Sequence, residues 1–220
     1  MLIKVENLSF GWQALLFDSV NCRLDEGQAV WLKGENGSGK TSFLKCLCGM
    51  IPHFERGKHL SGDVKISGHS VFENPPRFFF PQIAFINLSA LDLFLFTSSL
   101  HEETVIASSF TGFEYESCLR KLIFFQEFFH LPEKWQYTPF SNMDVQDKCL
   151  ALLAVFYTQQ AKIYLLDEIL KVFPPEKRQT WNAWLRHLKS EGACAVIASH
   201  EKPDGADCCW ALSQGGLHVL

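Results

Sequence analysis

Short apolar runs alternate with longer amphipathic stretches along the chain. Strand-like runs lie at residues 3–5, 22–24, 28–32 and 63–67, and runs that are apolar almost throughout lie at 163–166 and 193–199. Strands that are apolar at every position are typical of a parallel sheet that is buried on both faces. The alternation of such runs with helical patterns therefore predicts an α/β fold with a largely parallel sheet.

The middle of the chain, from about residue 88 to residue 148, has a different pattern. Within residues 115–129, large side chains recur at helical spacing, and no part of the region resembles a strand. We interpret the region as a helical subdomain inserted into the α/β body. Because 220 residues are enough for one α/β domain with a full core, we expect a single domain over residues 1–220.

Charge and composition argue against one class of partner. The formal net charge is −4, and the 24 acidic and 20 basic residues are scattered without a run of five like charges. This distribution argues against a nucleic-acid-binding surface. The chain is 47% hydrophobic and contains 20 Phe, which indicates a dense core, an apolar surface for a partner, or both.

Cysteine usage and hydropathy bear on the compartment. The N-terminus lacks the apolar core of a secretory signal, so we expect reduced thiols in the cytosol. No run reaches the roughly 18 apolar residues that a membrane-spanning helix needs. The spacing of the cysteines does not match a metal site, and we expect buried, inert thiols at Cys22, Cys46, Cys48, Cys118, Cys149, Cys194, Cys208 and Cys209.

The strongest chemical signal is the segment GENGSGKTS, residues 34–42. It fits the pattern G-x-x-x-x-G-K-[ST] at Gly34, Gly39, Lys40 and Thr41, between an apolar run and a helical pattern. Glycines let successive backbone N–H groups point at a phosphate, and the following helix N-terminus adds partial positive charge. We expect Lys40 to reach the β- and γ-phosphates of a nucleotide and the Thr41 hydroxyl to ligate Mg²⁺.

Two further apolar runs end in candidate chemical groups. The run at 163–166 is followed by Asp167 and Glu168, at the carboxyl edge of the expected parallel sheet, where ligands bind in such folds. Asp167 would hold Mg²⁺ through water, and Glu168 would polarise an attacking water, although acids after a strand are also common turn formers. The run at 193–199 delivers His200, which alone would be structural or solvent-exposed.

In order and spacing, these elements resemble the ATP-binding-cassette (ABC) family over essentially the whole chain. VENLSFGW resembles the family's opening strand and aromatic loop, which places Trp12 over an adenine ring, with core packing as the rival role. GENGSGKTS resembles Walker A, IYLLDE resembles Walker B with Glu168, and IASHE resembles the segment of the switch histidine, His200. Residues 49–68 are similar to the energy-coupling-factor branch of vitamin and metal-ion importers.

The resemblance implies a P-loop NTPase fold: a RecA-like core, an N-terminal antiparallel β subdomain and the inserted helical subdomain. It implies ATP and Mg²⁺ as cofactors, Glu168 and His200 as catalytic residues, and Thr41 and Asp167 at the metal. It also implies a transmembrane permease as partner and a peripheral position at the cytoplasmic face of the inner or plasma membrane. The expected nucleotide-binding residues are Trp12, Gly34, Asn36, Gly37, Ser38, Gly39, Lys40, Thr41 and Ser42.

Three motifs depart from the family pattern. A gapless alignment places Leu88 at the Q-loop glutamine, and Gln82 would fit only in a shifted register. Residues 141–148 replace the LSGGQ signature, with Asp144 at its serine and Val145 and Gln146 at its glycines. In the family, the signature of one cassette closes over the phosphates that the other cassette binds, so Asp144 would place a negative charge against them. At about 4 Å and an effective dielectric near 20, the repulsion between two unit charges costs about 4 kcal/mol. The D-loop is replaced by KVFP, residues 171–174.

These departures lead to the hypothesis of an asymmetric pair with a second cassette whose signature is intact. The segment 88–96 would then receive a helix of the membrane subunit through Leu91, Leu93, Phe94 and Phe96, unless these residues are core. Two other hypotheses for the function stay open. One is a regulatory subunit that holds ATP with little or no hydrolysis, and the other is a soluble cassette that acts on DNA or ribosomes, which the acidity does not support.

Overall fold

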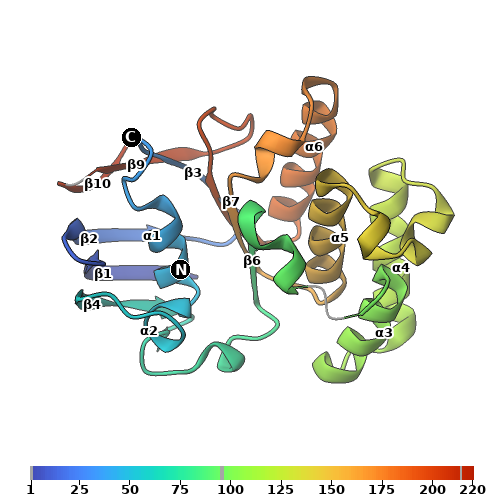
Figure 1. The fold of residues 1–220 in the computed structure, drawn as a ribbon, viewed down its shortest axis with the longest axis horizontal. Helices are drawn as coiled ribbons and strands as arrows, with labels where there is room; N and C mark the ends of the chain where they lie inside the picture. Colours follow the sequence, from blue (N-terminus) through green and yellow to red (C-terminus); the bar gives the residue numbers. More distant parts are fainter. Residues whose placement is uncertain (1, 95–96, 214) are drawn as a thin grey trace.

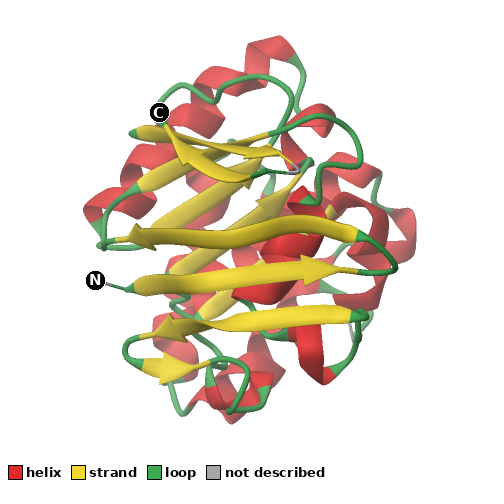
Figure 2. Ribbon diagram, turned by 90° about the vertical axis from the view of Figure 1, so that its left-hand side faces the viewer, coloured by secondary structure: helices red, strands yellow, loops and turns green. Residues whose placement is uncertain are grey.

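The computed structural model describes residues 2–94, 97–213 and 215–220, and it contains two sheets and a group of helices (Figure 1). One sheet is antiparallel, with strand order β2-β1-β4-β5. Figure 2 shows its three long strands face-on. Its strands are β1 (Ile3–Gly11), β2 (Leu15–Leu24), β4 (His59–Ile66) and β5 (His69–Ser70).

The second sheet has the strand order β10-β9-β3-β8-β7-β6. All of its neighbouring strands are parallel except β10, which pairs antiparallel with β9. The predicted α/β fold with a largely parallel sheet and an N-terminal antiparallel subdomain is confirmed. The strands are β3 (Ala29–Lys33), β6 (Ile83–Asn87), β7 (Ile163–Asp167), β8 (Cys194–Ala198), β9 (Cys208–Ser213) and β10 (Gly216–Val219).

Alternating side chains bury both faces of the parallel sheet. In β7, Tyr164 and Leu166 point into one hydrophobic cluster, whereas Ile163 and Leu165 point into the other. This alternation follows from the two-residue period of a strand, and it explains why β7 is apolar at every position up to its last residue. Asp167, at that last position, emerges at the carboxyl edge of the sheet.

Helices cover the two faces of this sheet. The face that also contacts the antiparallel sheet holds α1 (Lys40–Leu47), while α5 (Val145–Thr158) and α6 (Pro175–Ser190) cover the opposite face (Figure 1). The remaining α-helices are α2 (Met50–His53), α3 (Leu100–Thr111) and α4 (Tyr115–Phe128). Short 3-10 helices lie at Pro76–Phe78, Leu88–Phe94, Glu133–Tyr137, Phe140–Asn142 and Ile169–Val172.

Aromatic contacts join the helical region to the sheet layer. Phe125 of α4 packs edge-on against Trp184 of α6, with 4.9 Å between ring centroids, and Tyr157 of α5 lies 4.7 Å from the same ring. Such pairs add about 0.5–1.5 kcal/mol each to the energy of burial. The position of α4 therefore depends on α6, which also packs on the parallel sheet.

Several element predictions are too short or missing. Strands β1 and β2 extend to 9 and 10 residues because they pair along most of their length, whereas the apolar pattern marks only part of each. Strands β6, β9 and β10 are not predicted.

Among the eight thiols, six are buried and Cys22 and Cys208 are partly exposed. In the described ranges, no helix combines the length and apolar character needed to cross a membrane.

Candidate functional site

The loop between β3 and α1 has a backbone that requires glycine. A Cβ atom on Gly34 would lie 2.4 Å from the Ser38 Oγ and 2.8 Å from the Leu212 carbonyl oxygen. Gly39 has a φ of 96° in the left-handed region and forms the N-cap of α1. These two constraints explain the pattern seen in the sequence, because a side chain at either position would open the tight turn.

Lys40 lies across this loop. Lys40 is buried as a residue, and its ammonium group donates hydrogen bonds to the carbonyl oxygens of Gly34 at 2.7 Å and Glu35 at 3.1 Å. A cavity of about 730 Å³ adjoins the outer side of the loop, where Gly34, Asn36, Gly37 and Ser38 face Ser199, His200, Ser213 and His218. The loop amides, the helix N-terminus and this lysine together form a site suited to a phosphate chain.

Thr41 and Asp167 meet although they are far apart in sequence. The Thr41 hydroxyl donates to the Asp167 Oδ2 at 2.7 Å, and the side-chain amide of Asn87 donates to the same oxygen at 2.6 Å. The other oxygen, Oδ1, is buried and has no hydrogen-bond partner. Burial raises the pKa of Asp167, and the bonds from Thr41 and Asn87 oppose this shift.

This geometry fits Mg²⁺. The Thr41 hydroxyl gives its only hydrogen to Asp167, so its lone pairs remain available to a cation. The unpartnered Oδ1 of Asp167 is a hard, negatively charged oxygen, the ligand type that Mg²⁺ prefers directly or through water. The two predicted metal residues are therefore placed to act on one ion.

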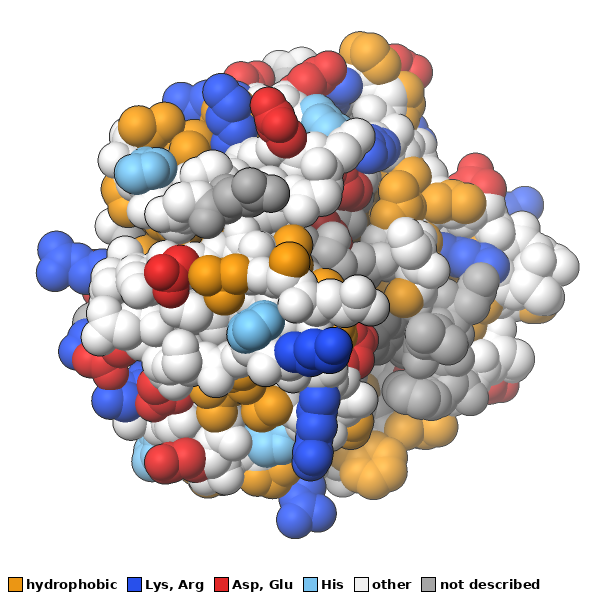
Figure 3. All heavy atoms as spheres, turned by 60° about the vertical axis from the view of Figure 1, so that its left-hand side comes forward, with side chains coloured by type: hydrophobic (Ala, Val, Ile, Leu, Met, Phe, Trp, Pro, Cys, Tyr) orange, Lys and Arg blue, Asp and Glu red, His pale blue; other side chains and the backbone are white. Residues whose placement is uncertain are grey.

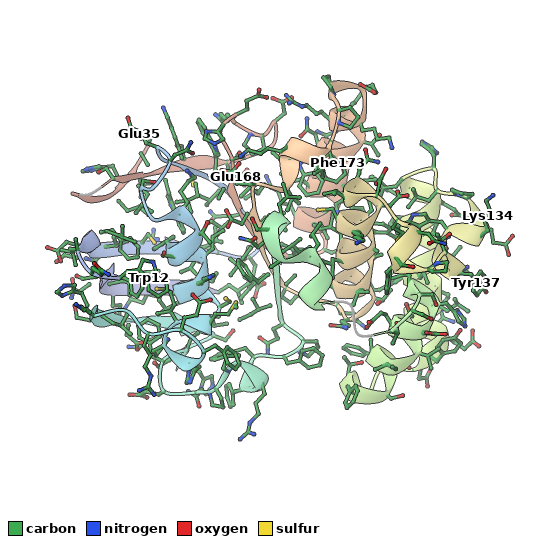
Figure 4. All side chains as sticks on the ribbon, in the orientation of Figure 1. Trp12, Glu35, Lys134, Tyr137, Glu168 and Phe173 are labelled. Atoms are coloured by element: carbon green, nitrogen blue, oxygen red, sulfur yellow. The ribbon has the colours of Figure 1, made fainter. Side chains whose placement is uncertain are left out.

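Glu168 follows Asp167 in an unusual conformation. Its φ of 61° lies in the left-handed region, and its N–H donates to the Ala198 carbonyl oxygen at 2.9 Å. This turn points the carboxylate toward His200, whose Nε2 lies 3.5 Å from Oε1, while Lys171 Nζ lies 2.9 Å from Oε2. Figure 4 labels Glu168 at the centre of the molecule. The two predicted catalytic residues are thus neighbours, and Lys171 is a third member that the sequence did not reveal.

Trp12 lies beside the phosphate loop helix, on the loop after β1 (Figure 4). Its indole N–H donates to the Ser42 hydroxyl at 3.1 Å, and its ring meets Phe10 edge-on with 5.0 Å between centroids. The side chain is 38% exposed, so Trp12 is not a core residue, although one edge of its ring is packed. An exposed aromatic ring held here is available to stack on a base.

Neither residue considered for the Q-loop position brings a polar side chain to the Asp167 carboxylate. Gln82 precedes β6, and its carbonyl oxygen accepts from the Ile163 N–H at the start of β7, so it lies about 16 Å of strand away from Asp167. Leu88 packs against the hydrophobic core. Asn87, which pairs with Asp167 across β6 and β7, holds the polar side chain instead. A polar residue closing a buried strand is the signal that could have identified it.

The segment that replaces the signature begins α5. Asp144 is the N-cap of this helix, and its carboxylate accepts a hydrogen bond from the Asp147 N–H at 2.8 Å. The helix N-terminus is therefore capped by an acid of the same chain. In the segment that replaces the D-loop, Phe173 is buried and stacks on Trp181 with 5.5 Å between ring centroids.

The predicted contact for a membrane subunit is only partly described. Leu91 is 4% exposed and belongs to the hydrophobic core, which selects core packing for this residue over a place in a surface pocket. The side chains of Leu93, Phe94 and Phe96 lie outside the described part of the chain. An apolar groove of about 510 Å³ is lined by other residues, including Phe54, Phe79, Phe80, Ile106, Phe110 and Phe156.

Comparisons with known proteins agree with this geometry. The model of the ABC transporter family matches residues 17–171, and the chain belongs to this family. A putative ABC transporter ATP-binding protein of Clostridium acetobutylicum is 25% identical over 203 residues, 91% of this chain and 83% of the relative. Another, from Pyrococcus abyssi, is 28% identical over 211 residues, 92% of this chain and 72% of the relative.

A solved structure supports the fold over the full length. CbiO1 from Clostridium perfringens, part of the ABC transporter complex CbiONQ, superposes with a TM-score of 0.81 at 16% identity and covers 99% of this chain and 86% of its own. As an ATP-binding subunit of the ABC class, the chain is an ATPase with ATP and Mg²⁺ as its cofactors.

Proposed function

We propose that this chain is one half of an asymmetric pair of cassettes that powers import of a small solute, such as a vitamin or a metal ion. A permease subunit would hold it at the cytoplasmic face of the membrane. The proposal rests on the difference between two parts of the chain, the residues at the sheet edge and the segment that replaces the signature. Lys40, Thr41, Asp167 and Glu168 converge at one sheet edge, whereas the N-terminus of α5 is capped by Asp144.

Each residue at the sheet edge has a distinct role in this proposal. Lys40 and the loop amides bind the phosphates, and Thr41 and Asp167 hold Mg²⁺, which withdraws charge from the phosphates when bound. Glu168 orients the attacking water and accepts its proton. His200, 3.5 Å from the Glu168 carboxylate, holds that carboxylate in place.

The capped α5 helix is the reason to expect asymmetry. In a homodimer, both composite sites would receive Asp144 opposite a nucleotide, at a cost of about 4 kcal/mol for each unit charge at about 4 Å in an effective dielectric near 20. A partner cassette with small signature residues avoids this repulsion at the site built on Lys40. The partner's nucleotide would face Asp144 and turn over slowly.

The apolar groove supports a membrane-embedded partner. Two of its side chains, Phe54 and Phe110, are 72% and 77% exposed, and they lie at the C-terminal end of α2 and on α3. Exposed apolar grooves on an otherwise charged surface mark binding sites for amphipathic helices. Figure 3 shows acidic and basic side chains interspersed over one face, which gives no support to a nucleic-acid partner.

Activity of the co-purified complex tests this proposal. The Glu168→Gln variant is compared with the equivalent substitution in the partner cassette, in the same detergent-extracted assembly. We expect Glu168→Gln to abolish most of the turnover, because the site on this chain is the working one. Unchanged activity would assign hydrolysis to the partner's site.

A second candidate function is a nucleotide-holding subunit with little hydrolysis. The ion pair between Lys171 and Glu168 favours it, because Lys171 occupies one of the two carboxylate oxygens that would otherwise contact the attacking water. Tight Mg-ATP binding without hydrolysis in every combination with partner subunits would select this function. Hydrolysis that requires Glu168 would exclude it.

A further inference from the structure

Two donors converge on a single oxygen of Asp167. The Thr41 hydroxyl and the Asn87 amide both donate to Oδ2, and Oδ1 remains buried without a partner. A carboxylate with both donors on one side cannot rotate freely, since rotation would break two hydrogen bonds at once. The orientation of Oδ1 therefore depends on Asn87 as well as on Thr41.

The direction of the Asn87 amide is determined by its second contact. Its Oδ1 accepts a hydrogen bond from the Ser89 N–H at 2.8 Å, in the turn that follows β6. A backbone N–H can only donate, so the amide oxygen must face Ser89 and the amide nitrogen must face Asp167. The strand register, which pairs Asn87 with Asp167, brings the two side chains to the same edge of the sheet.

We propose that Asn87 is a positioning residue for the bound metal ion, which holds the Asp167 carboxylate so that Oδ1 meets the hydration shell of Mg²⁺. The inference rests on the proposed metal role of Asp167 and Thr41. Asn87 acts on the metal ion through Asp167. It supplies the polar side chain beside the metal that neither Leu88 nor Gln82, the residues considered for the Q-loop position, brings there. Groups that orient a metal ligand in this way typically change metal affinity by about 10- to 100-fold when they are removed.

Nucleotide affinity with and without Mg²⁺ measures this role. The ratio of the dissociation constant of ATP in EDTA to that of Mg-ATP reports how strongly the protein-bound nucleotide holds the ion. We expect Asn87→Ala to lower this ratio by about 10-fold or more and to leave the affinity for ATP in EDTA unchanged. A residue that only stabilises the fold would change both affinities together.

A second variant separates the contact of Asn87 with Asp167 from its contact with the turn at Ser89. Asn87→Ser keeps a side-chain oxygen that can accept from the Ser89 N–H, but it is too short to reach Asp167. It should fold like the parent and show the same lowered ratio as Asn87→Ala. Asn74→Ala is the matched control, because the Asn74 side chain bonds to the Ser70 carbonyl oxygen away from the phosphate loop.

The outcomes distinguish this inference from the proposed function. If the parent protein binds ATP equally well with and without Mg²⁺, the metal role of Asp167 and Thr41 is wrong. If the parent depends on Mg²⁺ and both Asn87 variants keep the parent's ratio, only the role of Asn87 is wrong. A lowered ratio in both Asn87 variants, with the parent's ratio in Asn74→Ala, supports the inference.

Discussion

The carboxylate of Glu168 forms an ion pair with Lys171, with 2.9 Å between Oε2 and Nζ. Lys171 stands where the family pattern has its D-loop, and it is more than half exposed. An ion pair whose lysine is largely in solvent contributes only about 0–1 kcal/mol. It can therefore bias the position of Glu168 without preventing its use.

Replacement of Lys171 by Ala should increase hydrolysis. Because the substitution releases one oxygen of Glu168, we expect kcat to rise by at most about fivefold, with KM for ATP unchanged. Turnover of the assembled complex is the measurement. Lys134→Ala is the control, since Lys134 is an exposed lysine at the far end of the molecule (Figure 4). A fall in kcat would show instead that Lys171 assists the reaction.

Trp12 should contribute to recognition of the base. Stacking of its ring on adenine is worth about 0.5–1.5 kcal/mol, so Trp12→Ala should weaken ATP binding by about two- to twelvefold. Binding of inorganic tripolyphosphate, which has no base, should not change. Trp12→Phe keeps a ring and should retain most of the affinity for ATP. Equal losses for ATP and tripolyphosphate would mean that the bond from Trp12 to Ser42 supports the phosphate loop instead.

The apolar groove should attach the chain to its membrane partner. Phe110→Asp places a charge in the groove and should reduce recovery of the permease after gentle detergent extraction, while ATP binding stays intact. Tyr137→Asp, at an exposed aromatic residue outside the groove, is the matched control. Full recovery of the permease with Phe110→Asp would place the contact elsewhere.

The ion pairs of Glu6 in the antiparallel sheet should stop stabilising the folded protein in acid. Hydrogen bonds from Lys4 and then Lys65 lower the pKa of Glu6 to about 2, and Lys65 joins β4 to β1. The pKa of Glu6 is lower in the folded protein than in the unfolded chain. Its ionised carboxylate therefore stabilises the fold at any pH above the ordinary pKa of Glu, and this stabilisation is lost as the pH falls toward about 2. The difference in Tm between the parent and Glu6→Gln should therefore shrink between pH 5 and pH 2, and it should be smaller in high salt. A constant difference would contradict this account.

The positions of the candidate site residues were predictable where the pattern is local in sequence. The phosphate loop occupies nine consecutive residues, and Asp167, Glu168 and His200 directly follow apolar runs that the two-residue period of buried strands makes visible. Their convergence follows from the rule that parallel strands end at one edge of the sheet. That part of the site required no information about tertiary packing.

Asn87, Lys171 and the extent of several elements could not be predicted in the same way. An alignment without gaps placed Leu88 one residue from the side chain that contacts Asp167, and only the register of β6 on β7 decides between neighbours. Helix α5 is buried along most of its length, so its pattern lacks a polar face that would mark its bounds. The Lys171 contact depends on the left-handed turn at Glu168.

Calorimetric titration with Mg-ATP tests the central claim most directly. Lys40 donates to two carbonyl oxygens of the loop, and we expect this ammonium group to bind the phosphates. The parent protein should bind Mg-ATP with a measurable heat, and Lys40→Ala should lose that binding while its thermal unfolding in buffer stays close to the parent's. Equal heats for the parent and Lys40→Ala would contradict the account.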